Sequence, residues 1–214
     1  MAKKISCVLV CASPELSAEL VKSVVSDDDY VIAADGGMNV LNEAEITPDL
    51  FVGDFDSFSG SVPEGTEVLK LNVRKDDTDS MRCASLIAER GFERVVILGA
   101  TGGRGDHTFA NYFVIEFLAS KGIDAVIRTE AEEIRILDEG EHSFNNLNGR
   151  TFSVFPFSCE SVRVTYTGDT EYPAEGLVLH NLSTVGTSNV FRGDNAVIKI
   201  ESGRAIVFNS LKKL

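Results

Sequence analysis

Short apolar runs alternate with helix-like segments over the first part of the chain. Runs rich in β-branched residues, separated by helical patterns, are typical of a mostly parallel sheet covered by helices. The predicted strands of this part are 5–10, 30–34, 50–53, 68–71, 95–98 and 125–128.

Three segments between these strands repeat apolar residues at the spacing of an α-helix. The first begins at Ser13, an N-cap followed by a proline, and the second covers about 80–90 and ends at Gly91. The third covers about 107–121 and carries an aromatic stripe, which predicts a face packed into the core. That stripe consists of Phe109, Phe113 and Phe117.

The pattern changes near residue 130, where short alternating segments broken by Asn, Gly, Ser and Pro replace the helical patterns. Their spacing is typical of a β-sandwich. The predicted strands are 135–137, 151–155, 161–166, 176–179, 196–200 and 204–208. We therefore expect an N-terminal mostly parallel α/β sheet domain, residues 1–130, followed by a C-terminal β-sandwich domain, residues 131–214.

Composition narrows the range of partners and compartments. The 33 acidic and 20 basic residues give a net charge of −13, which disfavours nucleic acid, because binding to its backbone needs clustered Lys and Arg. The first residues have neither the layout of a signal peptide nor the length of a membrane span, so we expect no membrane partner and a cytoplasmic protein. The cysteines form no CxxC pair, and Cys7 and Cys11 are predicted to pack in the core.

Polar residues gather where four of the predicted parallel strands end. Open α/β sheets bind ligands at this edge, so a shared site is expected there. In strand order, the residues are Asp35 and Gly36 after the second strand, Asp54 and Asp56 after the third, 76–79 after the fourth, and 99–106 after the fifth.

Asp54 and Asp56 are separated by one residue, so both carboxylates can point to one side of an extended turn. Such oxygens suit Mg²⁺, which completes its shell with water and substrate phosphates. Asp79 can supply a third carboxylate from the start of its helix. The alternative is that these aspartates only cap turns of the backbone, but Asp35 and Asp106 at the same edge favour a metal site.

The segment 99–107 is a second candidate site. Its glycines expose backbone donors, Arg104 adds a fixed cation, and a helix begins beyond them, an arrangement suited to polyphosphate. His107 belongs to this loop or to the helix start. The segment is neither a Walker A loop nor a dinucleotide fingerprint, and a plain tight turn is the alternative. Together the residues predict a magnesium-dependent enzyme that moves a phosphate-containing group from a nucleotide.

Five ordered motifs resemble those of the thiamine pyrophosphokinases and together span nearly the whole chain. They are 34–39 (ADGGMN), 48–57 (PDLFVGDFDS), 75–79 (KDDTD), 102–107 (GGRGDH) and 186–189 (GTSN). The resemblance implies transfer of the pyrophosphoryl group of ATP to thiamine, giving thiamine diphosphate and AMP. It also implies a homodimer with the thiamine site at the subunit interface.

The resemblance assigns roles by motif. Asp54, Asp56 and Asp79 would hold Mg²⁺, and together with Asp106 they would form the catalytic group. Contacts to the nucleotide would come from Asp35, Gly36, Lys75, Thr78, Arg104 and His107, and contacts to thiamine from Ser188, Asn189 and Phe208. Phe208 takes the place of a tryptophan found in some members, and the alternative for it is an ordinary strand residue. Asp106 and Asp79 remain alternatives for accepting the hydroxyl proton.

Two other functions fit part of the pattern. One is a pyrophosphokinase for another small alcohol, such as a hydroxymethylpterin. The other is a non-catalytic sensor that binds a nucleotide or thiamine without turnover.

Overall fold

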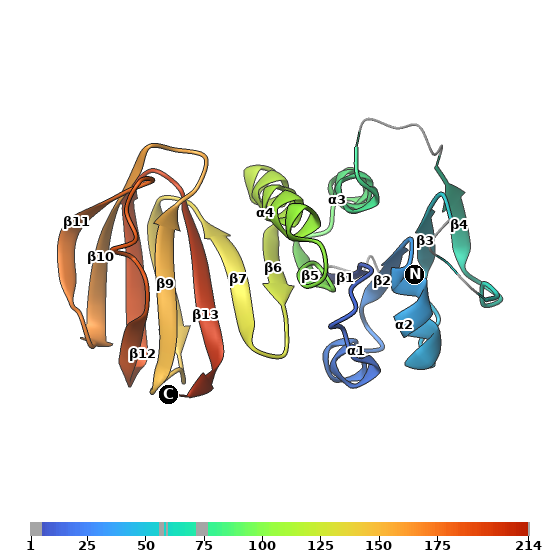
Figure 1. Cartoon of the computed structure of the whole chain (residues 1–214), viewed down its shortest axis with the longest axis horizontal. Helices are drawn as coiled ribbons and strands as arrows, with labels where there is room; N and C mark the ends of the chain where they lie inside the picture. Colours follow the sequence, from blue (N-terminus) through green and yellow to red (C-terminus); the bar gives the residue numbers. More distant parts are fainter. Residues whose placement is uncertain (1–5, 56–57, 59, 72–76, 214) are drawn as a thin grey trace. The chain divides into compact units, whose positions relative to one another are not determined.

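The computed structural model describes residues 6–55, 58, 60–71 and 77–213. They form two compact units, Met1–Thr129 and Glu130–Leu214, in a mixed α/β fold with few helices and extensive β-sheet (Figure 1). No helix in this described part of the chain is long and apolar enough to cross a membrane.

A parallel sheet organises the N-terminal unit. Its strand order is β6-β5-β1-β2-β3-β4, and each neighbouring pair is parallel, so the carboxyl ends of the strands share one edge. The strands are β1 (Ser6–Val10), β2 (Tyr30–Ala34), β3 (Leu50–Gly53), β4 (Glu67–Lys70), β5 (Arg94–Leu98) and β6 (Asp124–Arg128).

Two of the helices in this unit begin at side-chain caps. In α1 (Ala18–Val24), Ser17 Oγ accepts a hydrogen bond from Leu20 N at 3.1 Å. The predicted start at Ser13 is wrong, because Ser13 Oγ donates instead to the Thr101 carbonyl at 2.7 Å. Helix α3 (Asp79–Arg90) begins after Thr78 and ends at Gly91, which adopts a left-handed φ of 71° as an ending glycine does.

Helix α2 (Gly37–Glu43) was not predicted from the sequence, since seven residues carry too little periodicity. It begins where the chain passes β1 closely. A Cβ at Gly37 would lie 2.1 Å from the Val10 carbonyl oxygen, so only glycine permits this approach.

The prediction that the aromatic stripe of α4 (Gly105–Ser120) lies in the core is wrong. Phe109 is 56% exposed and Phe113 is 40% exposed, whereas the helix buries Asn111, Val114, Ile115 and Leu118. Apolar residues occupy several sides of this helix, so its periodicity did not identify the buried side.

Antiparallel pairs make up the described sheet of the C-terminal unit, in the order β7-β13-β9-β12-β10-β11, with β8 paired to β12. Its core includes the stacked rings of Phe152 and Phe191, whose centroids are 4.4 Å apart. The sandwich packing of these strands stays a prediction. The strands are β7 (Glu132–Leu137), β8 (Gly140–Asn145), β9 (Arg150–Pro156), β10 (Ser161–Thr170), β11 (Ala174–His180), β12 (Asn189–Ser202) and β13 (Ala205–Lys213).

Candidate functional site

A cavity of about 240 Å³ opens at the carboxyl edge of the parallel sheet. Its wall combines residues that follow β1, β2 and β5 with residues at the starts of α3 and α4. Among the predicted site residues, the cavity brings together Asp35, Thr78, Asp79 and His107.

Asp35 has an unusual backbone and an unusual carboxylate environment. It adopts a left-handed φ of 44°, which Asp tolerates better than most residues. Its Oδ1 is buried and has no hydrogen-bond partner within the described part of the chain. A buried carboxylate oxygen without a partner is unfavourable unless a donor or cation satisfies it. This oxygen therefore fits a site for a cation or a hydrogen-bonding ligand.

The start of α3 presents polar groups to the same cavity. Thr78 Oγ1 accepts a hydrogen bond from Met81 N at 3.2 Å and lies 3.1 Å from Ser80 Oγ. Ser80 Oγ donates to Asn111 Oδ1 at 2.8 Å. Since unpaired backbone N–H groups and the helix dipole favour anions at a helix start, this wall suits a phosphate group.

The loop after β5 is shaped by glycines with left-handed backbones. Gly99 has a φ of 69°, and a Cβ there would lie 2.2 Å from the Cys11 carbonyl oxygen. Gly102 has a φ of 88°, and its Cβ would meet the Ser13 hydroxyl at 2.9 Å. A Cβ at Gly99 would clash with the backbone after β1, and the left-handed backbone of Gly102 would strain any other residue, so both positions favour glycine.

Arg104 and Asp106 form a forked ion pair at the start of α4. Arg104 Nη2 lies 2.6 Å from Asp106 Oδ2, and Nε lies 3.1 Å from Oδ1. The two side chains are 71% and 65% exposed. The hydrogen bond from Arg104 holds the pKa of Asp106 below its ordinary value of 3.8. Neither residue lines the cavity in this arrangement.

A second cavity, of about 530 Å³, lies within the C-terminal unit. Tyr166, Tyr172 and Leu177 form part of its wall, together with the segment 185–189. Ser188 adopts a left-handed φ of 58°, and its N–H donates to Ser153 Oγ at 3.0 Å. The cavity therefore joins aromatic surface to a strained polar turn.

The side-chain amide of Asn189 holds the Tyr172 segment at this cavity. Asn189 Oδ1 accepts from Tyr172 N at 3.0 Å and from Val190 N at 2.8 Å, and Nδ2 donates to the Tyr172 carbonyl at 2.8 Å. Asn189 is 6% exposed, whereas Tyr172 is 65% exposed. The amide thus fixes the backbone of Tyr172 while the aromatic ring stays accessible.

Residues 21–127 match the family model described as thiamin pyrophosphokinase, catalytic domain. The chain belongs to this family. The family is named for a kinase, and membership therefore indicates a kinase-type transferase activity.

Similar proteins from a bacterium and a plant support the family assignment. Thiamine pyrophosphokinase of Bacillus subtilis (strain 168) is 26% identical over 185 residues, covering 84% of this chain and 86% of that protein. Thiamine pyrophosphokinase 3 of Oryza sativa subsp. japonica is 25% identical over 181 residues, covering 75% and 65% respectively. The match thus spans less than two thirds of the rice protein's length.

Solved structures share the fold. A crystal structure of thiamine pyrophosphokinase from Bacillus subtilis has a TM-score of 0.86 and 25% identity, covering 97% of this chain and 99% of that one. Thiamin pyrophosphokinase from Candida albicans has a TM-score of 0.80 and 16% identity over 97% and 89% of the two chains. The latter likeness concerns the fold alone.

The predicted magnesium ligands are only partly described. Asp79 lines the cavity, while Asp54 follows β3 and is half-buried without lining it. Asp56 lies outside the described residues, as does the predicted nucleotide contact Lys75. Within the described ranges, no three His, Cys, Asp or Glu side chains form a group able to hold a metal ion. The three-aspartate magnesium site therefore stays a prediction.

Phe55 anchors the turn that follows Asp54. It adopts a left-handed φ of 71°, and its ring stacks on Phe51 with a centroid distance of 4.5 Å. The Lys70 ammonium lies 5.8 Å from the same ring centroid.

Gly36, a predicted nucleotide contact, is the N-cap of α2 and does not line the cavity.

Phe208 is not among the residues that line the C-terminal cavity. It lies on β13 opposite Ser153, and its ring meets Phe155 edge-on at a centroid distance of 6.2 Å. Its predicted contact with thiamine stays a prediction.

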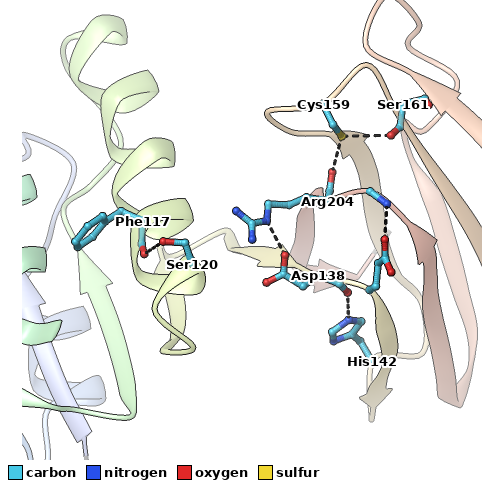
Figure 2. Close-up of polar contacts among 9 residues, drawn as sticks. Phe117, Ser120, Asp138, His142, Cys159, Ser161 and Arg204 are labelled. Carbon is cyan, nitrogen blue, oxygen red and sulfur yellow. Dashed lines mark hydrogen bonds and ion pairs between the residues drawn. The ribbon is translucent and has the colours of Figure 1, made fainter.

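His142 takes part in a polar cluster near the turn between β7 and β8 (Figure 2). Its Nε2 lies 2.8 Å from the Asp138 carbonyl oxygen, and Arg204 Nε donates to Asp138 Oδ1 at 2.6 Å. The Cys159 thiol donates to the carbonyls of Ser161 and Arg204 at 3.3 and 3.4 Å. These bonds join turns of the β unit and give His142 a structural contact within it.

Sequence reasoning missed Asn111 and Ser80 as cavity residues. Both line the cavity, and Asn111 is 8% exposed. A polar Asn between apolar residues of α4, with Phe109 and Ala110 before it and Phe113 and Val114 after it, was the available signal, because a buried amide needs specific hydrogen-bond partners.

Proposed function

We propose that this protein transfers the pyrophosphoryl group of ATP to thiamine, giving thiamine diphosphate and AMP, with Mg²⁺ as cofactor. The observation that most supports this proposal is a single cavity lined by Asp35, whose Oδ1 has no hydrogen-bond partner in the described part of the chain, and by the start of α3. Membership of the thiamin pyrophosphokinase family supports the choice of substrates.

Hard oxygen donors at the sheet edge suit Mg²⁺. In the proposal, Asp54, Asp56 and Asp79 hold the ion, and Asp35 accepts a hydrogen bond from the nucleotide or a metal-bound water. Bound Mg²⁺ would neutralise phosphate charge during transfer. In the same proposal the nucleotide is oriented by Gly36, Lys75, Thr78, Arg104 and His107, and the first N–H groups of α3 would donate hydrogen bonds to a phosphate oxygen.

Arg104 has to exchange partners in this proposal. Its guanidinium fork is engaged by Asp106, and both side chains are mostly exposed. An exposed ion pair contributes little stability, so polyphosphate can replace the carboxylate at small cost. While the pair persists, the lowered pKa of Asp106 makes it a weak base. Displacement by polyphosphate would free Asp106 from this effect, so Asp106 and Asp79 remain alternatives as acceptor of the thiamine hydroxyl proton.

The C-terminal cavity supplies aromatic surface for thiamine. Tyr172 presents an accessible ring that can stack on an aromatic heterocycle and attract a cation. Ser188 and Asn189 border the same cavity. In the proposal they and Phe208 contact thiamine, and the site lies at the interface of a homodimer.

A coupled assay tests the function directly. Purified protein is mixed with Mg²⁺, ATP and either thiamine or a hydroxymethylpterin, and AMP and the diphosphorylated product are quantified. We expect both products with thiamine only. Turnover with the pterin alone indicates the other pyrophosphokinase, whereas calorimetric binding of thiamine or ATP without turnover indicates a sensor.

A further inference from the structure

A buried amide side chain joins two walls of the N-terminal cavity. Asn111 Oδ1 accepts a hydrogen bond from Ser80 Oγ, at the start of α3. Asn111 Nδ2 donates to the Ala100 carbonyl, in the glycine-rich loop, and each of these two distances is 2.8 Å. One side chain therefore connects the start of α3 to the loop after β5.

The connection extends to the cap of α3. Ser80 Oγ lies 3.1 Å from Thr78 Oγ1, which in turn accepts the bond from Met81 N. A buried amide is unfavourable unless its polar atoms find partners, and here the oxygen and the nitrogen both have one. The position of Thr78, Asp79 and Ser80 relative to the loop is thus specified by directional bonds rather than by apolar packing alone.

We propose that Asn111 is a positioning residue for pyrophosphoryl transfer, acting through Ser80 and Ala100 to hold the start of α3 against the glycine-rich loop. The inference rests on the proposed function of this cavity as the nucleotide site. Transfer of a phosphoryl-type group depends mainly on positioning and charge stabilisation. A small displacement of these two walls therefore lowers the rate even when the fold is intact.

The variant Asn111→Ala removes both bonds without adding volume. We expect kcat/KM for ATP to fall about 100-fold, the loss typical of a misplacement of about 1 Å. The KM for thiamine should stay at the wild-type value, because thiamine is proposed to bind the C-terminal cavity. A KM for thiamine that rises as much as the KM for ATP would overturn the proposal.

Ser85 lies on α3, the same helix as Ser80, and offers a matched control for the variant Ser80→Ala. Its hydroxyl donates to the Met81 carbonyl of α3 at 3.1 Å and does not reach the cavity wall. We expect Ser85→Ala to keep the wild-type kcat/KM and Ser80→Ala to lower it. Equal activity of the two serine variants would contradict a role for the Ser80 bond.

A double-mutant cycle tests whether Asn111 acts through Ser80. If it does, Ser80→Ala combined with Asn111→Ala loses no more kcat/KM than Asn111→Ala alone, since the shared bond is already gone. Fold-changes that multiply indicate independent effects and overturn the proposed connection.

Two measurements separate an effect of Asn111 on the position of the cavity walls from an effect on folding. Calorimetry measures the affinity for a non-hydrolysable ATP analogue with Mg²⁺, and thermal unfolding measures the stability of the variant. We expect Asn111→Ala to remain folded and to bind the analogue about tenfold more weakly. Recovery of wild-type affinity and turnover on cooling indicates a merely structural role and overturns the proposal. If the wild type binds the analogue but forms no thiamine diphosphate, the proposed function is wrong, and the affinity comparison alone still decides the role of Asn111.

Discussion

At the scale of the residue, Asp35 has a buried carboxylate oxygen without a hydrogen-bond partner in the described part of the chain, and it lines the cavity that we propose as the nucleotide site. Asp35→Asn preserves the shape and tolerates the left-handed backbone of this position. We expect turnover to fall by orders of magnitude, because the charge is lost from the nucleotide and metal site. We also expect the melting temperature to stay level or rise, because burying a neutral amide costs less than burying a charged carboxylate.

Steady-state kinetics and thermal unfolding measure these two effects. Asp28→Asn, at an exposed position outside the cavity, is the control and should change neither. Wild-type turnover in Asp35→Asn would exclude Asp35 from the site.

Asp56 belongs to the predicted magnesium group although it lies outside the described residues. Asp56→Asn should keep the fold, as measured by circular dichroism, and lose turnover by orders of magnitude, because an amide is a poor replacement for an anionic Mg²⁺ ligand. Turnover equal to that of the wild type would remove Asp56 from the metal site.

Asn189 is expected to affect thiamine binding through the Tyr172 segment as well as by its proposed contact. Asn189→Ala breaks three hydrogen bonds at a buried position, so we expect a loss of about 2 kcal/mol in the free energy of unfolding. We also expect a raised KM for thiamine and an unchanged KM for ATP. Urea unfolding and kinetics measure this, and the exposed Asn181→Ala serves as control. A change in the KM for ATP alone would contradict the proposed role.

At the scale of the element, the start of α3 serves both the helix and the cavity. Thr78→Ala removes the N-cap bond to Met81 and should cost about 1 kcal/mol in the free energy of unfolding. It should also weaken binding of Mg²⁺ and the ATP analogue, whereas Thr78→Ser keeps the hydroxyl and should restore both. Chemical denaturation and calorimetry measure the two effects. Failure of serine to restore binding would show that the hydroxyl is not the relevant group.

Element boundaries were predictable where the local signal was strong. Gly91 ended α3 as expected, because a left-handed residue ends a helix whatever packs against it. The start of α1 was misplaced, because Ser13 and Ser17 are both acceptable caps and only the contact of Ser13 with Thr101 distinguishes them.

At the scale of the whole molecule, buried thiols make stability depend on alkaline pH. Burial, followed by the charge of Asp79, raises the pKa of Cys11 from 9.0 to about 12. Burial is likewise the first cause that raises the pKa of Cys7 and Cys83 above 9.0. The folded state therefore retains protons that the unfolded chain releases above about pH 9. The stability contributed by these neutral thiols is fully present below that pH and is lost as the pH rises toward 12.

Urea unfolding at about pH 8 and about pH 10.5 measures this dependence, and the free energy of unfolding should be lower at the higher pH. Cys83→Ala removes one of the buried thiols and should reduce the difference between the two measurements. A free energy that rises over this interval would contradict the assignment.

The sequence by itself determined the family, and it is the source of the proposed chemistry. The alternation of strands and helices, the aspartates at strand ends and the five motifs are local features, readable because backbone geometry and residue chemistry act over a few positions. They predicted a shared site at the sheet edge. Asp35, Thr78, Asp79 and His107 line one cavity there, whereas Asp54, Arg104 and Asp106 do not line it.

Only the tertiary structure decided which side of α4 is buried, that the side chain of Asn111 joins α3 to the glycine-rich loop, and that Asn189 bonds to the backbone of Tyr172. Each of these contacts joins residues from different elements. Burial and hydrogen-bond partners of this kind depend on how separate elements pack, and periodicity along one segment carries no information about that packing.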